Sequence, residues 1–209
     1  MTGSRLTEWR RLVDWSAGHG LRLAEEQVDQ LATYLEVLQL WNQKIALVAQ
    51  KEAAEIICKH FADSLFVAAH CGDAERLIDL GSGAGFPGLP IAIARSATHV
   101  QLVESRGKKA SFLERVCQIA AIHNAVVCNA RIEALAGQAE HRGRYSIVTG
   151  RALASAARFL ALATPFLQRG GRLIAMRSVN EPPPESSDVE EIRYELPDGT
   201  PRRLIVTRL

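Results

Sequence analysis

"LIDLGSGAGFPGLPIAIA", residues 77–94, is the stretch that decides the fold. An apolar run with an acid, Asp79, leads into a loop and then into a second apolar stretch. The glycines and prolines of the loop region are Gly81, Gly83, Gly85, Pro87 and Pro90. Glycine permits unusual dihedrals and close approach of a ligand, and proline is compatible with a first helical turn. The pattern predicts a strand, a ligand-binding loop and a helix.

The residues that surround this loop, 73–180, alternate short apolar runs with amphipathic stretches. The strand-like runs are RLIDLG (76–81), HVQLVES (99–105), AVVCN (125–129), YSIVTG (145–150) and RLIAMRS (172–178). Helix-like stretches between them are GKKASFLERVCQIAAI (107–122) and SAARFLALATPFLQ (155–168). Such alternation predicts parallel strands joined by crossover helices, with ligands bound beyond the carboxyl ends of the strands.

The two ends of the chain have other patterns. Apolar residues recur at helical spacing in two stretches of residues 1–72, namely Val28, Leu31, Leu35 and Leu38, and Ile56, Ile57, Phe61 and Leu65. The tail EIRYELPDGTPRRLIVTRL (191–209) predicts an antiparallel hairpin around residues 197–200, and NEPPPESSD (180–188) predicts a linker or loop. We therefore expect an α/β fold, with a helical segment over 1–72 and a mostly parallel sheet over 73–209.

Composition narrows the cellular setting. The chain has 209 residues, 47% of them hydrophobic, but no apolar stretch long enough to cross a membrane, and its start lacks the apolar run of a signal peptide. Its four cysteines form no C-x-x-C pair, which favours reduced, buried thiols over zinc ligands or disulfides. We expect a cytoplasmic protein without a metal; the cysteines are Cys58, Cys71, Cys117 and Cys128.

Positive charge is concentrated in the middle of the chain. Residues 73–180 carry 14 Lys and Arg against 7 Asp and Glu, a net charge of +7, whereas the overall net charge is +2. Arg106, Lys108 and Lys109 stand where a helix begins, and the helix macrodipole disfavours cations there. RNA phosphates would explain these cations, and a solvated helix start is the alternative.

The acids around the glycine loop favour an adenosine-containing cofactor. Glu104, which closes the second strand 23 positions after Gly81, is placed to bind two ribose hydroxyls. The pattern D-x-G-x-G-x-G differs from the dinucleotide pattern G-x-G-x-x-G, which serves a pyrophosphate. S-adenosylmethionine has no phosphate, and Asp79 could help to hold its ammonium group. Alternatively, the glycines only make a tight turn.

Three further places are candidates for the site. Ile132 and Glu133 follow the third strand and could border an adenine ring, although an acid in a turn is often only a helix cap. Arg151, after the fourth strand, could orient substrate or cofactor, or could belong to a surface ion pair. The orienting candidates on the helical segment, which could face the cleft or serve packing and capping, are His60, Asp63 and Ser64.

With these residues laid out, the chain resembles the RsmG (also called GidB) family of methyltransferases, which make 7-methylguanosine in the small-subunit (16S) rRNA. The similarity spans roughly residues 25–178. It is carried by W41-N-Q-K, H60-F-A-D-S, the loop L77-I-D-L-G-S-G-A-G-F-P-G-L-P, L102-V-E-S-R-G-K-K-A-S-F-L, A130-R-I-E and I147-V-T-G-R-A. The combination of G-F-P-G-L-P with E-S-R-G-K-K is the most specific part of it.

The resemblance implies a Rossmann-like class I methyltransferase fold, S-adenosylmethionine as cofactor, and 16S rRNA or the small ribosomal subunit as partner. We expect residues 1–72 to form a substrate-binding cap and the protein to be a monomer, although the sequence itself does not give the oligomeric state. Family cofactor contacts fall on Gly81, Phe86, Ile132, Glu133 and Arg151. The chain departs from the family at Ala46, Leu47 and Val48, where members have N-L-T, and at Met176, Arg177 and Ser178, where they have L-K-G. Arg177 is a candidate RNA contact.

Methyl transfer to guanine N7 is an in-line displacement that needs no general base, because N7 presents a lone pair without a proton. Alignment at near-attack distance should supply most of the rate. The fourth strand, YSIVTGRA, lacks the N-P-P-Y element for exocyclic amines and the Pro-Cys nucleophile for pyrimidine carbons. The alternatives are a methyltransferase acting on a small molecule or protein, a nicotinamide oxidoreductase, and a non-catalytic cofactor-binding module.

Overall fold

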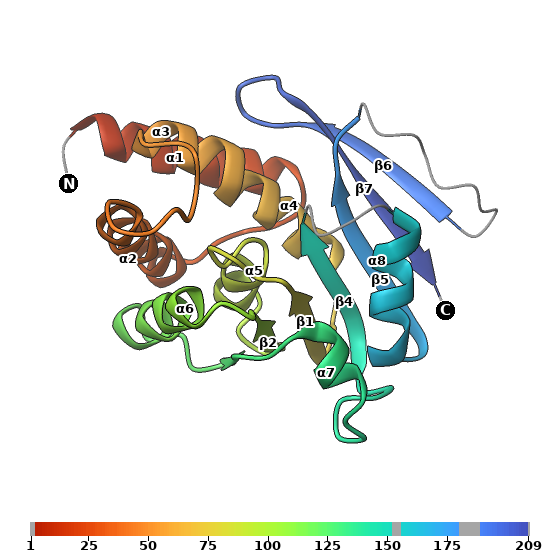
Figure 1. Cartoon of the computed structure of the whole chain (residues 1–209). Helices are drawn as coiled ribbons and strands as arrows, with labels where there is room; N and C mark the ends of the chain where they lie inside the picture. The colour runs from red at the N-terminus through yellow and green to blue at the C-terminus, as the bar shows by residue number, and fades with distance from the viewer. Residues whose placement is uncertain (1–2, 152–155, 180–188, 209) are drawn as a thin grey trace.

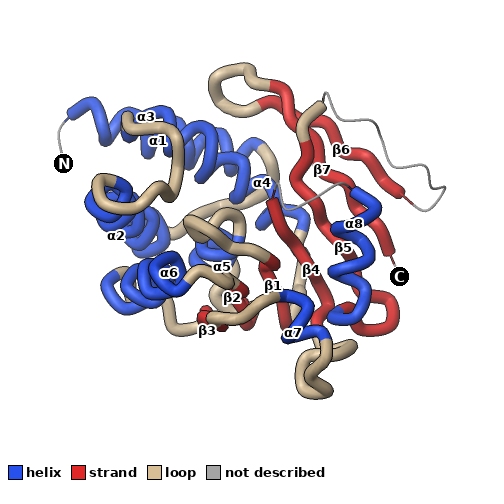
Figure 2. The backbone as a smooth tube through the Cα atoms, in the orientation of Figure 1, coloured by secondary structure: helices blue, strands red, loops and turns tan. Residues whose placement is uncertain are grey.

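A computed structural model of the chain describes residues 3–151, 156–179 and 189–208, and in this part the strands form one seven-stranded sheet. The strand order is β3-β2-β1-β4-β5-β7-β6 (Figures 1 and 2). The strands are β1 Arg76–Leu80, β2 His99–Val103, β3 Ala125–Cys128, β4 Tyr145–Arg151, β5 Leu167–Arg177, β6 Val189–Glu195 and β7 Pro201–Arg208. The first five are parallel, and β7 pairs antiparallel with both β5 and β6. The predicted α/β class and C-terminal hairpin are confirmed.

Helices precede the sheet and connect its strands. They are α1 Gly3–Gly18, α2 Glu25–Asn42, α3 Ala53–Ile56, the π-helix η1 Ile57–Ala62, α4 Asp63–His70, α5 Gly88–Ala94, α6 Gly107–Ile119, α7 Ile132–Ala136, α8 Ala156–Ala163 and the 3₁₀ turn η2 Thr164–Phe166. The predicted boundary at residues 72 and 73 falls in the turn between α4 and β1. The predicted linker 180–188 lies outside the described residues.

One predicted helix end is wrong. The pattern of residues 155–168 predicted a helix up to Gln168, but α8 ends at Ala163 and β5 begins at Leu167. Pro165 has no N–H to donate within a helix, and it lies in the short 3₁₀ turn that follows α8. Leu167 pairs instead with Tyr145 at the start of β4. The strand is therefore longer than its apolar run indicated.

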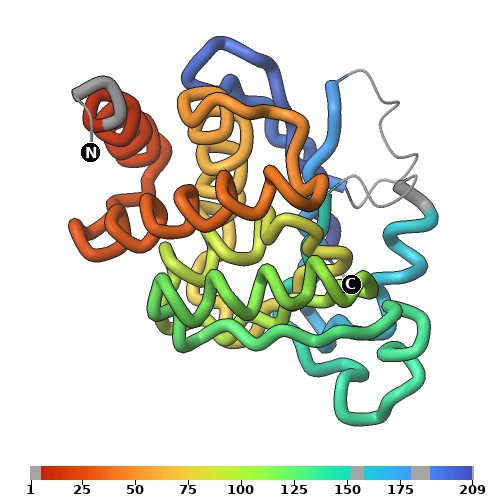
Figure 3. Tube along the Cα trace, turned by 60° about the vertical axis from the view of Figure 1, so that its left-hand side comes forward, coloured from red at the N-terminus to blue at the C-terminus, as the bar shows by residue number. Residues whose placement is uncertain are grey.

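The sheet separates two apolar cores because successive strand residues point to opposite faces. Leu77 of β1 packs with the helices α1 to α6, whereas its neighbours Ile78 and Leu80 pack with α7 and α8. Figure 1 shows α5 and α6 on one side of the sheet and α8 on the other, and Figure 3 shows α2 running beside α6. The N-terminal helices thus continue the helical layer on this face of the sheet, on the side of the carboxyl ends of the strands.

The C-terminal hairpin returns to the first helices (Figure 1). The indole Nε1 of Trp15 on α1 donates to the carbonyl of Glu195 at 3.2 Å, and the guanidinium of Arg11 donates to the carbonyl of Pro197. The ring of Tyr194 on β6 stacks on Phe66 of α4 with centroids 3.6 Å apart. The two ends of the described chain are therefore packed together.

The four cysteines are free thiols, but only Cys71 is buried, so the expectation of four buried thiols was too broad. Cys58, Cys117 and Cys128 are half-buried. Within the described ranges, no helix combines the length and hydropathy needed to span a bilayer. The same residues hold no group of three or more side chains of the kinds that bind metal ions.

Candidate functional site

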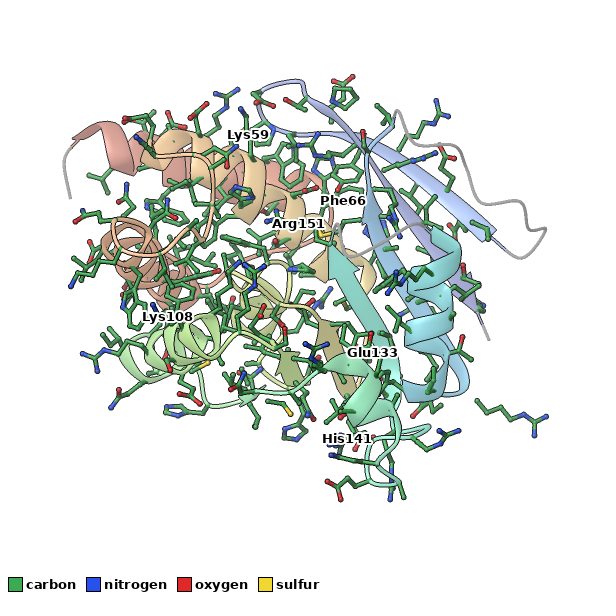
Figure 4. The ribbon with its side chains drawn as sticks, viewed as in Figure 1. Lys59, Phe66, Lys108, Glu133, His141 and Arg151 are labelled. Atoms are coloured by element: carbon green, nitrogen blue, oxygen red, sulfur yellow. The ribbon has the colours of Figure 1, made fainter. Side chains whose placement is uncertain are left out.

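A cavity of about 540 Å³ opens at the carboxyl ends of β1, β2 and β4, within the range of small-ligand sites. Figure 4 shows Arg151 at the end of β4 and Glu133 on α7, two of the elements that surround it. Its lining residues are Gly81, Gly83, Val103, Glu104, Ser105, Arg106, Lys109, Ala130, Arg131, Ile132, Glu133 and Arg151. The structure therefore brings together residues from four stretches of the chain, 81–83, 103–109, 130–133 and 151, at the place where open α/β sheets bind ligands.

The loop after β1 has a left-handed backbone at each of its predicted glycines, with φ of 71° at Gly81, 58° at Gly83 and 94° at Gly85. Gly83 lines the cavity, and a Cβ there would meet no atom closer than 3.7 Å. Gly85 does not line the cavity, because a Cβ would lie 2.5 Å from Leu89 Cδ1 and 2.7 Å from Tyr34 Oη. Gly83 shapes the cavity wall, whereas Gly85 allows α2 to pack against the loop.

Glu104 is fixed by main-chain donors on both sides. Its Oε2 accepts the N–H of Gly83 at 2.9 Å, and its Oε1 accepts the N–H of Arg106 at 2.7 Å. The residue is 7% exposed and lines the cavity. Hydrogen bonds to a carboxylate are stronger than those between neutral groups, so Glu104 ties the glycine loop to the start of α6. Its remaining lone pairs can accept further donors from a ligand.

Asp79 lies beneath the loop, outside the lining of the cavity. It is fully buried, and its Oδ2 accepts the N–H of Gly88, the first residue of α5, at 3.2 Å. Its Oδ1 has no hydrogen-bond partner among the residues that the structure describes. Burial raises the pKa of this carboxyl to about 7. Asp79 therefore supports the loop and the beginning of α5, and it retains one unsatisfied acceptor.

The third strand leads to another wall of the cavity. Ile132 and Glu133 are the first residues of α7, and both line the cavity, as does Arg131 before them. Ile132 is half-buried and Glu133 is exposed. The wall thus offers an apolar side chain next to a carboxylate, which suits a flat ring with an exocyclic amine.

Arg151 connects the cavity to the helical segment. Its Nη1 donates to Nδ1 of His60 at 2.7 Å, and its Cζ lies 5.3 Å from the centroid of Phe86. The rings of His60 and Phe86 are stacked at 5.0 Å. Phe86 is 2% exposed and is not part of the cavity lining. Phe86 and His60 therefore influence the cavity through their contacts with Arg151, which lines it.

Asp63 and Ser64 serve contacts within the protein. Ser64 is fully buried and its hydroxyl donates to the carbonyl of His60 at 2.7 Å. Asp63 is 4% exposed; it accepts a hydrogen bond from Tyr194 and lies 3.6 Å from Arg202 Nε. Burial raises the pKa of Asp63. Of the three orienting candidates on this segment, His60 is the one that, within the described residues, hydrogen-bonds a residue lining the cavity.

The predicted RNA-contacting cations differ in exposure. Arg106 and Lys108 are exposed, Lys109 is half-buried, and Arg106 and Lys109 line the cavity. Lys108 points outward from α6 (Figure 4). Arg177 differs, because it is 8% exposed and its Cζ lies 5.8 Å from the Phe159 ring. Arg106, Lys108 and Lys109 therefore form a basic edge at the cavity, and Arg177 is packed beside α8.

Sequence reasoning missed the roles of three residues, Arg131, Gln50 and Asn42. Arg131 lines the cavity and could have been found from its place just before Ile132. Gln50 Oε1 lies 2.7 Å from Nε2 of His60, and no motif marks this residue. The departure from N-L-T at residues 46–48 leaves a loop that Asn42 holds by its side chain, because Asn42 Oδ1 accepts the N–H groups of Leu47 and Val48 at 2.9 and 3.0 Å.

Solved structures with a similar fold include an O-methyltransferase from Bacillus cereus in complex with SAH, with a TM-score of 0.61 and 15% identity over 85% of this chain and 91% of that one. The cofactor-bound Rv0187 from MTB has a TM-score of 0.60 and 17% identity over 86% and 89% of the two chains. These likenesses confirm the predicted Rossmann-like methyltransferase fold.

Sequence comparison is more specific. The family described as rRNA small subunit methyltransferase G (GidB) matches residues 27–188. A ribosomal RNA small subunit methyltransferase G from Roseiflexus castenholzii is 43% identical over 157 residues, which are 75% of this chain and 67% of that protein. A protein of the same name from Acetivibrio thermocellus is 37% identical over 79% of this chain and 69% of its own length. The family match spans well over half of the residues of this chain. The chain therefore belongs to the rRNA small subunit methyltransferase G family.

Proposed function

We propose that the protein transfers the methyl group of S-adenosylmethionine to N7 of a guanine in the small-subunit (16S) rRNA. The observation that carries this proposal is the different placement of two acids, Asp79 and Glu104, around the glycine loop. Glu104 is available at the cavity wall, while Asp79 accepts the first N–H of α5. Family membership and the basic edge beside the cavity favour an rRNA substrate.

The chain's residues fit this cofactor better than a dinucleotide. A pyrophosphate needs the free N–H groups at the start of the helix after the loop, but the carboxylate of Asp79 already accepts the N–H of Gly88 there. A buried acid at this point disfavours an anionic ligand and suits a cationic one. Oδ1 of Asp79 is also an acceptor to which none of the described residues donates.

Each lining residue has a role that follows from its chemistry. We assign the ribose hydroxyls to Glu104, whose carboxylate is held by two main-chain amides. We assign the adenine ring to the wall formed by Ile132 and Glu133. Arg151 then orients the reacting partners from the end of β4. S-adenosylmethionine, when bound, supplies an electrophilic methyl group.

The transfer needs no general base from this chain, because guanine N7 has an accessible lone pair and no proton. His60 fits this requirement, since burial and the neighbouring cations lower its pKa to about 3 and its Nδ1 already accepts a hydrogen bond from Arg151. The chain contributes alignment: the glycine loop, Glu104 and Arg151 fix the geometry in which N7 meets the methyl carbon.

The substrate side of the proposal rests on charge. Arg106, Lys109 and Arg131 line the cavity, and Lys108 lies on the same turn of α6 as Lys109. Cations at this position can hold the phosphates of a nucleotide whose base reaches the cavity. The alternative is a methyltransferase with the same cofactor site that acts on a small molecule or protein. A neutral substrate of that kind would gain nothing from a basic edge.

The test is to incubate the protein with methyl-labelled S-adenosylmethionine and with small ribosomal subunits or naked 16S rRNA from cells that lack this enzyme. We expect label at one guanine, which mass spectrometry of nuclease fragments identifies as 7-methylguanosine. Label on another atom of the RNA would refute the N7 assignment. Binding that is insensitive to salt, together with transfer only to small molecules or proteins, would favour the alternative substrate class.

A further inference from the structure

Among the residues that the structure describes, the side chain of Arg151 makes one hydrogen bond, to a ring nitrogen of His60. Its guanidinium lies over the face of Phe86 and donates to Nδ1 of His60 at 2.7 Å. Stacking on Phe86 constrains the tilt of the guanidinium, but it leaves the group free to rotate in its own plane. The hydrogen bond to His60 removes that freedom. The direction of the remaining N–H groups of Arg151 therefore depends on His60.

This hydrogen bond requires one protonation state of His60. Arginine has only donors, so Nδ1 must be the acceptor and must carry no proton. The other nitrogen, Nε2, then carries the proton and donates to Oε1 of Gln50 at 2.7 Å. If the proton moved to Nδ1, two N–H groups would face each other at the Arg151 contact. Gln50 stabilises the tautomer that carries its proton on Nε2, in which this clash does not arise.

We propose that Gln50 and His60 are positioning residues that orient Arg151 toward the cavity, with Gln50 selecting the tautomer of His60 and His60 fixing the guanidinium. This inference rests on the proposed function, because it assigns Arg151 to the cofactor and nucleotide held there. It also links the loop after α2, where Gln50 lies, to the end of β4. The N-terminal segment thereby contributes to the geometry of a site that lies on the sheet.

The charges around His60 keep its ring neutral. Arg151 from β4, Arg202 from β7 and Lys59 from the same helical segment all disfavour a further positive charge. Burial acts in the same direction and more strongly, and together they lower the pKa of His60 to about 3. The ring therefore stays an acceptor for Arg151 across the neutral range.

The sharpest test compares two amides in place of the ring. The Oδ1 atom of His60→Asn falls close to the position of Nδ1 and can still accept from Arg151. The Oε1 atom of His60→Gln falls close to the position of Nε2 and cannot. We expect His60→Asn to keep cofactor affinity within about threefold, and His60→Gln to lose about tenfold or more, as for a hydrogen bond to a charged group. Calorimetry with S-adenosylmethionine measures both, and KM and kcat with rRNA follow.

A second set of variants changes Gln50. Gln50→Leu removes the acceptor of the Nε2 proton, so we expect a smaller loss in the same direction. Gln50→Glu places a carboxylate at Nε2 and should raise the pKa of His60, so that affinity and kcat fall as the pH is lowered toward the new pKa. The matched control is His70→Gln on α4, which should leave the affinity and the pH profile unchanged. The His70 ring packs against the Phe66 ring, and its Nδ1 hydrogen-bonds with the carbonyl of Phe66.

A readout without cofactor separates this inference from the proposed function. Nitrogen chemical shifts of the His60 ring in the free protein should show a proton on Nε2, none on Nδ1, and no titration between pH 5 and 8. A protonated Nδ1, or equal affinities of folded His60→Asn and His60→Gln, would overturn the positioning role. If the wild-type protein failed to bind S-adenosylmethionine while the ring showed the expected tautomer, the proposed function would fail and the contact to Arg151 would stand.

Discussion

The two walls of the cavity are built in different ways. On the side of β1 and β2, one carboxylate binds two main-chain amides: Glu104 accepts from Gly83 and Arg106, all within 24 residues of chain. On the side of the helical segment, side chains from distant parts of the sequence meet: His60 binds Arg151, which lies 91 positions away. The first wall depends on local backbone, and the second depends on how the whole chain packs.

Both walls lie within the part of the chain that the family model matches. The matched residues, 27–188, contain the glycine loop, Glu104 and Arg151. The α1 helix and the β6–β7 hairpin lie outside that match. Trp15 of α1 donates to the carbonyl of Glu195 in the hairpin, and Tyr194 of the hairpin donates to Asp63 of α4. The comparison indicates that cofactor binding should respond to changes at the first wall, whereas stability should respond to changes behind the second.

The largest effect is expected at the first wall. Glu104→Ala leaves the N–H groups of Gly83 and Arg106 without their acceptor and removes the group assigned to the ribose. At about 1.5–3 kcal/mol for each hydrogen bond to a charged group, we expect a loss of S-adenosylmethionine affinity of at least about 100-fold by calorimetry. Glu104→Gln, which keeps an acceptor oxygen, should lose less. Undiminished affinity of a folded Glu104→Ala protein would refute the cofactor assignment.

The basic edge should affect RNA and spare the cofactor. Changing Arg106, Lys108 and Lys109 together to Ala should weaken rRNA binding by about tenfold or more, and should reduce the slope of log K against log salt by about 2. The measurement is a filter-binding titration over a range of salt concentrations. A control that removes the same charge elsewhere is the triple Ala variant at the exposed residues Arg115, Arg142 and Arg144. Equal rRNA affinity of the two triple variants would remove the basic edge from the site.

Behind the second wall, Tyr194→Phe should reduce stability without changing cofactor affinity. The variant removes the hydroxyl that donates to the buried carboxylate of Asp63, which retains only Arg202 at 3.6 Å. We expect a loss of about 1.5–3 kcal/mol in the free energy of unfolding, measured by urea titration. Arg193→Ala, on the same strand but exposed, is the control and should stay within about 0.5 kcal/mol of wild type. A large loss of cofactor affinity in Tyr194→Phe would show that the two walls are not independent.

The smallest effect distinguishes the two acids of the first wall. Because burial raises the pKa of Asp79 to about 7, the folded protein keeps a proton that the unfolded chain has already lost. The contribution of Asp79 to stability should therefore be present below about pH 4 and should decline as the pH rises through 7. Asp79→Asn should flatten this decline by on the order of 1 kcal/mol between pH 5 and 8, as measured by urea titration. An unchanged pH dependence would indicate that Asp79 is ionised throughout this range.

The first wall could be predicted from the sequence because it follows from topology. Parallel strands that end at one edge bring the loop after Asp79 next to Glu104 and next to Ile132, whatever the details of side-chain packing. The strands and the hairpin were found for the same reason, since their apolar runs and turn residues are local signals. Three predicted cofactor contacts differ, because Asp79, Gly85 and Phe86 do not line the cavity. At Gly85 the space is filled by Leu89 and Tyr34.

The second wall could not be derived in this way. The spacing of His60, Asp63 and Ser64 was read with the period of an α-helix, but residues 57–62 form a π-helix, whose wider turn changes which side chains share a face. Ser64 bonds the carbonyl of His60, four residues earlier, and Asp63 faces the hairpin. His60 contacts Gln50 and Arg151, and no local sequence pattern connects these three positions.

The most direct test of the whole account is a crystal structure of the protein with S-adenosylhomocysteine. We predict that the nucleoside occupies the 540 Å³ cavity with its ribose hydroxyls on Glu104, its adenine beside Ile132 and no phosphate-sized gap at the start of α5. An empty cavity at saturating ligand, or a nicotinamide dinucleotide bound there in its place, would contradict the assignment.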